Sequence, residues 1–295
     1  MKVEAECADC LIHRGYMEIR EATGDPSLQF ETISAVLRLI GGEFKATTVP
    51  SYIGTERDRL IKKITGNPDP YARKKKLSNQ KALGVLPLVK TLVSKETSPE
   101  ARFRKACLGS MVGNVIEFDI PGHTFKFGDV GKLIQQAEQD LAIDEISQIF
   151  DLAKKAKRVL YLTDNAGEIA FDTLLVRELR KLGPRVAVAV KAEPILNDAT
   201  LEDAKQVGMQ EVADALITLG TDSVGLILEE CSKEFLDLYN SVDLVMAKGM
   251  GYAESITEID PPSPQALLLR AKCQPVANFF KVKKGNNIAK LIFNM

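Results

Sequence analysis

The second half of the chain contains four short apolar runs rich in β-branched residues, and this feature restricts the fold most. The runs cover residues 158–163, 185–190, 215–220 and 242–247, with roughly 20 residues between one run and the next. Near-continuous apolarity is typical of strands that are covered on both faces. The segments between the runs carry helical patterns, such as FDTLLVRELRKLG after the first run. Repeated strand–helix–strand units predict an α/β fold with a doubly wound, mostly parallel, Rossmann-like three-layer sheet.

The first half of the chain and the residues after the fourth run have different patterns. Up to about residue 150, apolar residues recur three and four positions apart, as in DCLIHRGYMEIREAT, which is typical of amphipathic helices. After the fourth run, residues 276–282 and 289–294 have the composition of strands, and we expect the last strand to be antiparallel at the sheet edge. We therefore predict an N-terminal all-α domain over residues 1–150 and an α/β domain over residues 151–295.

Charge and hydropathy exclude several classes of partner. The 295 residues are 45% apolar and 27% charged, as in ordinary globular proteins. A net charge of -1 and a pI near 6.2 provide no electrostatic footprint for nucleic acid or an anionic membrane. No apolar run reaches the roughly 18 residues of a membrane span, and the first residues lack the apolar region of a signal peptide. We expect a cytoplasmic protein without nucleic-acid or membrane partners, and homo-oligomerisation stays open.

Polar side chains follow each of the four apolar runs. In an open parallel sheet, ligands bind at the carboxyl ends of the strands. The side chains expected at that edge are Asp164, Asn165, Glu168, Asn197, Asp198, Thr221, Ser223, Lys248 and Glu254. The first cluster has two carboxylates with no lysine or arginine beside them in the sequence, which favours neutralisation by a group from outside the chain.

A metal ion is the simplest such group. Asp164, Asn165 and Asp198 supply the oxygen ligands that hard cations prefer. Asp164 and Asp198 are 34 residues apart, one βαβ unit, so they can face each other across neighbouring strand ends. We predict one divalent ion here, Mg²⁺ or Mn²⁺, with Co²⁺ or Ni²⁺ as alternatives. The competing interpretation is that both aspartates only cap the helices that follow them.

Lys248 indicates the charge of the substrate. It lies beside Gly249 and Gly251, and a lysine in a glycine-rich turn at a helix N-terminus can hold an anion. Thr221 and Ser223 add hydroxyl groups for substrate binding. The alternative is a solvated lysine at a strand end. A metal ion, a lysine and hydroxyl-rich loops together predict a phosphate ester as substrate.

Signatures of several other enzyme classes are missing from the sequence. It contains no G-x-x-x-x-G-K-[ST] and no G-x-S-x-G, and GMGYAE fits a nicotinamide fingerprint poorly because it follows the fourth run. Ala166 stands where haloacid-type phosphatases have a second aspartate. His13 and His123 both lie in the helical half and are too few for a His-based metallohydrolase.

These motifs resemble those of the domain-of-unknown-function-89 proteins, also called metal-dependent damage-control phosphatases. The resemblance covers nearly the whole chain. It rests on CADC (7–10), DPYARKKKLSNQKAL (69–83), GNVIEF (113–118), DNAGE (164–168), ILNDAT (195–200) and DLVMAKGMGYAES (243–255). The N-terminal C-x-x-C is similar to that of the archaeal-type subgroup.

The resemblance implies a helical domain on a Rossmann-like sheet, with one divalent cation at the strand ends. By position, Asp164, Asn165 and Asp198 match the metal ligands of the family, and Lys248 matches the residue near the substrate phosphate. The residues that lie in family motifs and are assigned to substrate binding from their placement alone are Glu168, Asn114 and Glu254. The implied activity is hydrolysis of small phosphate monoesters, either sugar phosphates or damaged phosphometabolites.

The expected mechanism gives catalytic roles to Asp164, Asp198 and Lys248. The metal would bind a phosphoryl oxygen and orient a water, while Lys248 and backbone N–H groups hold the remaining charge. Direct attack by an aspartate stays open. A methyltransferase that uses S-adenosylmethionine is the alternative function, with Glu193 or Asp198 as its adenosine-binding acid. A non-enzymatic metabolite-binding protein is the third.

Cys7 and Cys10 form a C-x-x-C at the start of the first predicted helix. The motif fits half of a four-thiolate zinc site, a redox pair or two packed thiols, although no βαβ unit surrounds it as in thioredoxin-like proteins. A zinc site would take its other ligands from His13, Cys107 or Cys273. We predict that Cys7 and Cys10 hold the helical domain near the site and take no part in phosphoryl chemistry.

Overall fold

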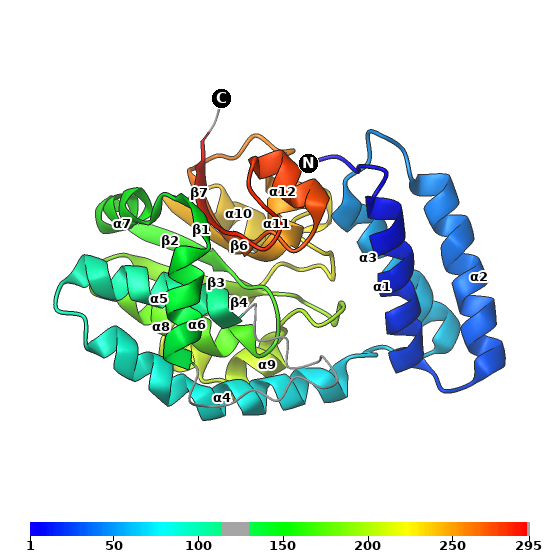
Figure 1. Cartoon of the computed structure of the whole chain (residues 1–295), viewed down its shortest axis with the longest axis horizontal. Helices are drawn as coiled ribbons and strands as arrows, with labels where there is room; N and C mark the ends of the chain where they lie inside the picture. The colour runs from blue at the N-terminus through cyan, green and yellow to red at the C-terminus, as the bar shows by residue number, and fades with distance from the viewer. Residues whose placement is uncertain (114–129, 294–295) are drawn as a thin grey trace.

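The computed structural model describes residues 1–113 and 130–293, and these contain a seven-stranded sheet between two helical layers, with three more helices beside it (Figure 1). The predicted α/β fold with a mostly parallel sheet and helical N-terminal region is confirmed. In the same residues, no helix is both long and apolar enough to cross a membrane.

The helices are named in chain order. They are α1 (Cys7–Ala22), α2 (Pro26–Glu43), α3 (Pro50–Thr65), α4 (Ala72–Ser94), α5 (Pro99–Gly113), α6 (Val130–Gln139), α7 (Ile146–Lys155), α8 (Glu168–Lys181), α9 (Leu201–Gln206), α10 (Lys233–Tyr239), α11 (Gly249–Ile256) and α12 (Gln274–Phe280). The strands are β1 (Leu141–Asp144), β2 (Arg158–Leu162), β3 (Arg185–Val190), β4 (Ala215–Thr218), β5 (Leu244–Lys248), β6 (Gln265–Arg270) and β7 (Asn287–Ile292).

The order of the strands creates a switch point at the centre of the sheet. The order is β1-β7-β6-β5-β2-β3-β4, and every neighbouring pair is parallel except β6 and β7. From β2 the chain goes outward through β3 and β4, then returns to β5 on the other side of β2. Open α/β sheets bind their ligands at the carboxyl ends of the strands on the two sides of such a point, which are β2 and β5 here.

Alternate residues of the strands pack into two separate apolar cores, as the pleat of a strand requires. Tyr161, Val188 and Met246 point to the face that helices α4 to α9 cover. Leu160 and Val245 point to the opposite face, which α10, α11 and α12 cover. The sheet is therefore buried on both faces, which accounts for the near-continuous apolar runs.

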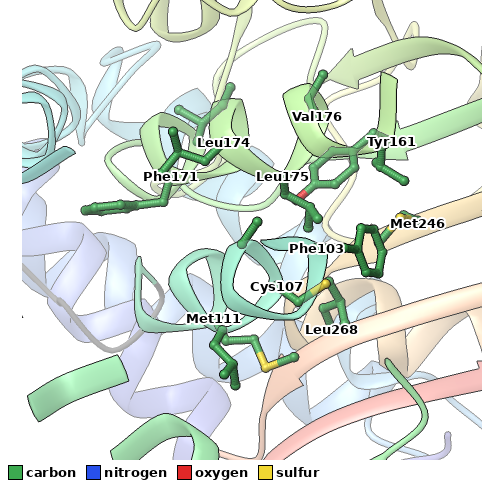
Figure 2. Packing of buried hydrophobic residues seen from close by; sticks show 14 of the residues in the cluster. Phe103, Cys107, Met111, Tyr161, Phe171, Leu174, Leu175, Val176, Met246 and Leu268 are labelled. Carbon is green, nitrogen blue, oxygen red and sulfur yellow. The ribbon is translucent and has the colours of Figure 1, made fainter. Parts of the chain in front are cut away.

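Helix α5 lies within the first core. Phe103, Cys107 and Met111 of this helix are buried, and Figure 2 shows their side chains among those of α8 and of the central strands. Helices α4 to α6 thus share one core with the sheet, although they precede residue 150. The domain boundary at residue 150 stays a prediction.

Helices α1, α2 and α3 have a small apolar core of their own and stand beside the layers (Figure 1). Its buried members are Leu11, Ile19, Val36, Ile40, Ile53 and Ile61. Pro26 and Pro50 open α2 and α3, where the missing N–H of proline costs nothing because the first helical N–H groups have no partner within the helix.

The strand predicted over residues 276–282 is wrong, because this segment lies mostly in helix α12. Pro275 occupies the first turn, and proline there favours a helix. Phe280 is buried whereas its neighbour Phe279 is exposed. The run is too short for sequence periodicity to distinguish a helix from a buried strand.

Two strands escaped the sequence pattern. One is β6, with the sequence QALLLR, which pairs in parallel with β5. The other is β1, which lies between α6 and α7 in a region predicted to be helical. With four residues, β1 is too short to show an alternation. The predicted last strand corresponds to β7, which is antiparallel to β6, but β1 lies beyond it at the edge.

Candidate active site

The loops after β2 and β3 are paired directly with each other. Asn165 and Asp198 form an isolated antiparallel β-bridge. The N–H of Ala199 donates to the carbonyl of Asp164 at 2.8 Å, and the N–H of Ala166 donates to that of Asn197 at 2.9 Å. Backbone pairing therefore brings Asp164, Asn165 and Asp198 together at the carboxyl edge of the sheet, as their positions in the sequence predicted.

The end of β5 approaches the same cluster. Gly249 has a φ of 87°, and a Cβ atom at this position would lie 2.0 Å from Oδ2 of Asp164. Only glycine combines this backbone conformation with so close an approach. The glycine after Lys248 thus allows the turn from β5 into α11 to rest against the Asp164 carboxylate.

The donor set fits a hard divalent cation. The side-chain nitrogen of Asn165 donates to Oδ2 of Asp164 at 2.8 Å and to Oε2 of Glu168 at 3.3 Å. A cation would therefore take the amide oxygen of Asn165 together with oxygens of Asp164 and Asp198. Oxygen donors of this kind suit Mg²⁺ or Mn²⁺.

Burial perturbs the carboxylates of this cluster. Burial raises the pKa of Asp198 to about 6, against the opposing charge of Lys191. Burial also raises the pKa of Glu168 to about 7, where Lys248 opposes the rise and Asp164 adds to it. Carboxylates in a dry site need nearby positive charge to stay ionised.

Lys248 is fully buried, so the alternative of a solvated lysine is wrong. Its ammonium group forms ion pairs with Glu168 and, at 3.0 Å, with Asp172. It also lies 3.4 Å from the carbonyl of Ser110 on α5. Burial disfavours the charge of Lys248, but the two carboxylates outweigh this and raise its pKa. The lysine is charged and held next to the Asp164 cluster.

Asp172 was not identified from the sequence. Its Oδ1 atom accepts hydrogen bonds from Tyr161 at 2.8 Å and Ser110 at 2.6 Å, in addition to the contact with Lys248. It follows Glu168 by four residues on α8, and this i, i+4 spacing is a signal that could have indicated a shared face.

Lys191 is a second buried lysine that sequence reasoning missed. Its ammonium lies 3.7 Å from Oδ2 of Asp198, 2.9 Å from the carbonyl of Gly225 and 4.5 Å from the centre of the Tyr252 ring. Burial lowers its pKa, although Asp198 and Asp164 oppose this. It directly follows β3 as Lys248 ends β5, and this equivalent position was the available signal.

Helix α4 supports the turn after β2. Oδ1 of Asn79 accepts a hydrogen bond of 2.6 Å from the N–H of Gly167, whose φ is 83°. The side-chain nitrogen of Asn79 donates to Asp203 at 2.8 Å. Asn79 lies in the DPYARKKKLSNQKAL motif, so this part of the helical half positions the DNAGE turn.

Comparison with known proteins identifies the family. A profile of the damage-control phosphatase ARMT1-like domain matches residues 3–288. The chain belongs to this family. It is 40% identical over 294 residues to an uncharacterised protein of Methanocaldococcus jannaschii, with 98% of this chain and 95% of that protein covered. It is 34% identical to the damage-control phosphatase of Archaeoglobus fulgidus, with 99% and 100% covered.

A crystal structure of a DUF89 family protein from Pyrococcus horikoshii has the same fold. Its TM-score is 0.89 at 32% identity, and each chain is covered completely. The family inferred from the sequence motifs is confirmed, whereas its archaeal-type subgroup stays a prediction.

The remaining residues that were predicted to bind the substrate have different surroundings. The hydroxyl of Thr221 donates to Glu230 at 2.8 Å and accepts from the N–H of Ser223 at 3.1 Å. The hydroxyl of Ser223 is buried without a hydrogen-bond partner among the described residues. Glu254 interacts with the N–H of Ser51 at the start of α3, and burial raises its pKa to about 7. Asn114 lies outside the described residues. Substrate contacts of these residues stay predictions.

The C-x-x-C lies near Glu254, whose charge adds to the burial that raises the pKa of Cys7. Cys7 is buried and Cys10 exposed at the start of α1. Burial raises the pKa of Cys273 to about 11, and the charges of Glu254, Cys10 and Cys7 add to the effect, so Cys273 lies near the C-x-x-C. Within residues 1–113 and 130–293, no three His, Cys, Asp or Glu side chains are arranged to hold a metal ion.

Proposed function

We propose that this member of the family is a divalent-metal-dependent phosphatase that hydrolyses small phosphate monoesters, either sugar phosphates or damaged phosphometabolites. The names of the A. fulgidus and P. horikoshii relatives, both damage-control phosphatases, support the reaction class. The bridge between Asn165 and Asp198 carries the proposal, because it joins the two loops that contain Asp164, Asn165 and Asp198 at the carboxyl edge of the sheet, where such folds bind ligands.

Asp164, Asn165 and Asp198 would hold the metal ion, Mg²⁺ or Mn²⁺. When bound, the ion supplies a Lewis acid for a phosphoryl oxygen and lowers the pKa of a bound water. The three residues would bind the ion through oxygen atoms alone, since the amide nitrogen of Asn165 donates hydrogen bonds to carboxylates.

Other groups of the site would stabilise the negative charge of the substrate. Lys248 carries a positive charge that Glu168 and Asp172 hold in place. The turn at Gly249 begins α11, whose first N–H groups have no partner within the helix and can face a phosphate. Interactions of this kind stabilise the charge that develops in the transition state.

A screen of phosphate esters with several divalent cations tests the proposal. We expect release of inorganic phosphate from a small sugar phosphate only when Mn²⁺, Mg²⁺, Co²⁺ or Ni²⁺ is added. Asp164→Ala should abolish both metal binding and activity while the circular dichroism spectrum stays native, and Glu31→Gln on the exposed face of α2 is the control.

Three outcomes would contradict the proposal. Activity of wild-type level in Asp164→Ala with chelator would exclude the metal mechanism. Ligand binding without turnover would favour a metabolite-binding protein. Methyl transfer from S-adenosylmethionine without phosphate release would favour a methyltransferase.

A further inference from the structure

Helix α3 has a polar stripe that none of the catalytic assignments uses. Ser51, Thr55, Asp58 and Lys62 are spaced by four, three and four residues, so they lie on one face of the helix. The opposite face contains Ile53 and packs into the core of α1, α2 and α3. Side chains of the stripe reach the loops that follow β3 and β4.

Asp58 contacts the loop that carries Asp198. The carboxylate is fully buried, and its Oδ1 atom accepts a hydrogen bond of 3.0 Å from the N–H of Leu196. Leu196 has a φ of 47°, a left-handed conformation that is unfavourable for a branched side chain. The turn is closed by a 3.0 Å hydrogen bond from the N–H of Asp198 to the carbonyl of Ile195.

Lys62 strengthens the same attachment. Its ammonium lies 2.7 Å from Oδ2 of Asp58 and donates to the carbonyl of Pro194 at 2.6 Å. It also donates to Asp222 at 3.2 Å. Two consecutive side chains of the stripe therefore hold Pro194 and Leu196, just before Asp198 in the chain.

The loop after β4 is held by the same helix. Thr55 accepts a hydrogen bond of 2.9 Å from the N–H of Val224. Arg59 forms ion pairs of 2.6 Å with Asp222 and with Glu230. Helix α3 thus fixes the positions of two strand-end loops that are not adjacent in the sequence.

We infer that Asp58 is a positioning residue for the metal site: through Leu196 it holds the turn that places Asp198 opposite Asn165. The inference rests on the proposed function, because it assigns Asp58 a role toward the same metal ion. Without the Asp58 acceptor, Leu196 is free to return to a negative φ, and the rotation moves the backbone of Asn197 and Asp198. A carboxylate out of place weakens metal binding even though every ligand is present.

Binding of Mn²⁺ to the purified full-length protein, measured by isothermal titration calorimetry, tests this inference. Asp58→Ala should weaken binding by about 10- to 100-fold, as is usual when a residue that orients a metal ligand is removed. Asp58→Asn keeps an oxygen acceptor for the Leu196 N–H and should restore most of the affinity. Lys63→Ala removes an exposed charge from the same helix and should leave the affinity unchanged.

The stability of each variant is measured by thermal unfolding, because Asp58 is buried. If Asp58→Ala does not fold, Lys62→Met decides, since it removes the contact with Pro194 and should weaken Mn²⁺ binding by a smaller factor. Wild-type affinity in a folded Asp58→Ala protein, or equal weakening in Asp58→Asn and Asp58→Ala, overturns the inference alone. A wild-type protein that binds no divalent cation, or an Asp164→Ala variant that binds Mn²⁺ normally, overturns both the inference and the proposed function.

Discussion

Two groups of helices from the first half of the chain are attached to the sheet in different ways. Helices α4, α5 and α6 share a continuous apolar core with the sheet, as the burial of Phe103 and Met111 illustrates (Figure 2). Helix α3 instead reaches the strand-end loops through hydrogen bonds and ion pairs from Asp58, Arg59 and Lys62.

The two kinds of attachment have different effects: apolar packing stabilises the fold, and polar contacts position the strand-end loops. Burial of apolar surface stabilises a fold strongly but has no preferred direction. Hydrogen bonds and bidentate ion pairs contribute less net energy, but they determine where a particular atom lies. We therefore expect changes in α5 to affect mainly stability and changes in α3 to affect mainly the site.

Truncation of the shared core should have the largest effect. Phe103→Ala removes a fully buried ring and should lower the free energy of unfolding by about 3–5 kcal/mol. Hydrogen exchange should then accelerate in β2 and β5. Ile53→Ala in the smaller core should accelerate exchange in α1, α2 and α3 and leave the sheet protected. Equal acceleration in the sheet for both variants would show that the two cores unfold as one unit.

Lys248 tests whether α5 also contributes to the site, since its ammonium contacts the carbonyl of Ser110. Lys248→Met should lower the turnover number by about 10²–10³, because one charge-assisted contact to the transition state is lost. Metal affinity should be retained. The exposed Lys233→Met is the control, and a loss below about threefold for Lys248→Met would mean that the buried lysine only supports packing.

Glu18 should make the stability of the α1–α3 core depend on pH. Burial and the nearby Asp58 raise its pKa to about 9, and the 3.5 Å ion pair with Arg57 opposes the rise without cancelling it. The folded state thus binds a proton that the unfolded state releases above its ordinary pKa. The contribution of Glu18 to stability is therefore complete below the ordinary pKa of a glutamate. As pH rises from there toward 9, the free energy of unfolding falls by up to about 1.4 kcal/mol per pH unit.

Urea unfolding between pH 6 and 9 measures this dependence. Glu18→Gln cannot ionise and should flatten the decline, whereas Glu31→Gln on exposed α2 should leave it unchanged. A parallel pH profile for wild type and Glu18→Gln would show that Glu18 is ionised in the folded protein.

The smallest effect is expected at the C-x-x-C. Cys7→Ser with Cys10→Ser should lower the melting temperature by a few degrees, because burying a hydroxyl costs more free energy than burying a thiol. At temperatures below the melting temperature, the turnover number should stay within about tenfold of wild type. Loss of a contact to the transition state would lower it by more, about 10²–10³. Complete loss of turnover in a folded double variant would place the thiols in the active site.

Much of the fold followed from local pattern. The runs at 158–163 and 185–190 correspond to β2 and β3, since a strand buried on both faces must be apolar throughout. The pattern was wrong over 276–282, where seven residues fit either a helix or a strand. β1 was missed because four residues show no period.

The candidate site also has features that the sequence predicted and features that it did not. The grouping of Asp164, Asn165 and Asp198 was predictable, because consecutive parallel strands end at one edge and their order in the chain indicates their proximity. The contact of Asp58 with Leu196 was not, because 138 residues separate them and a polar residue on a helix looks the same in sequence whether it faces water or a loop.

Local sequence thus specifies the helical and strand periodicity, the strand ends and the polar side chains that meet at the carboxyl edge of the sheet. It does not specify the burial of Lys248 between Glu168 and Asp172 or the contact of Lys191 with Asp198. Nor does it specify the hydrogen bonds and ion pairs between α3 and the loops after β3 and β4. These depend on which helix face packs against which loop. That choice is made by the packing of the whole chain, since each contact gains its energy only after the surrounding groups have left water.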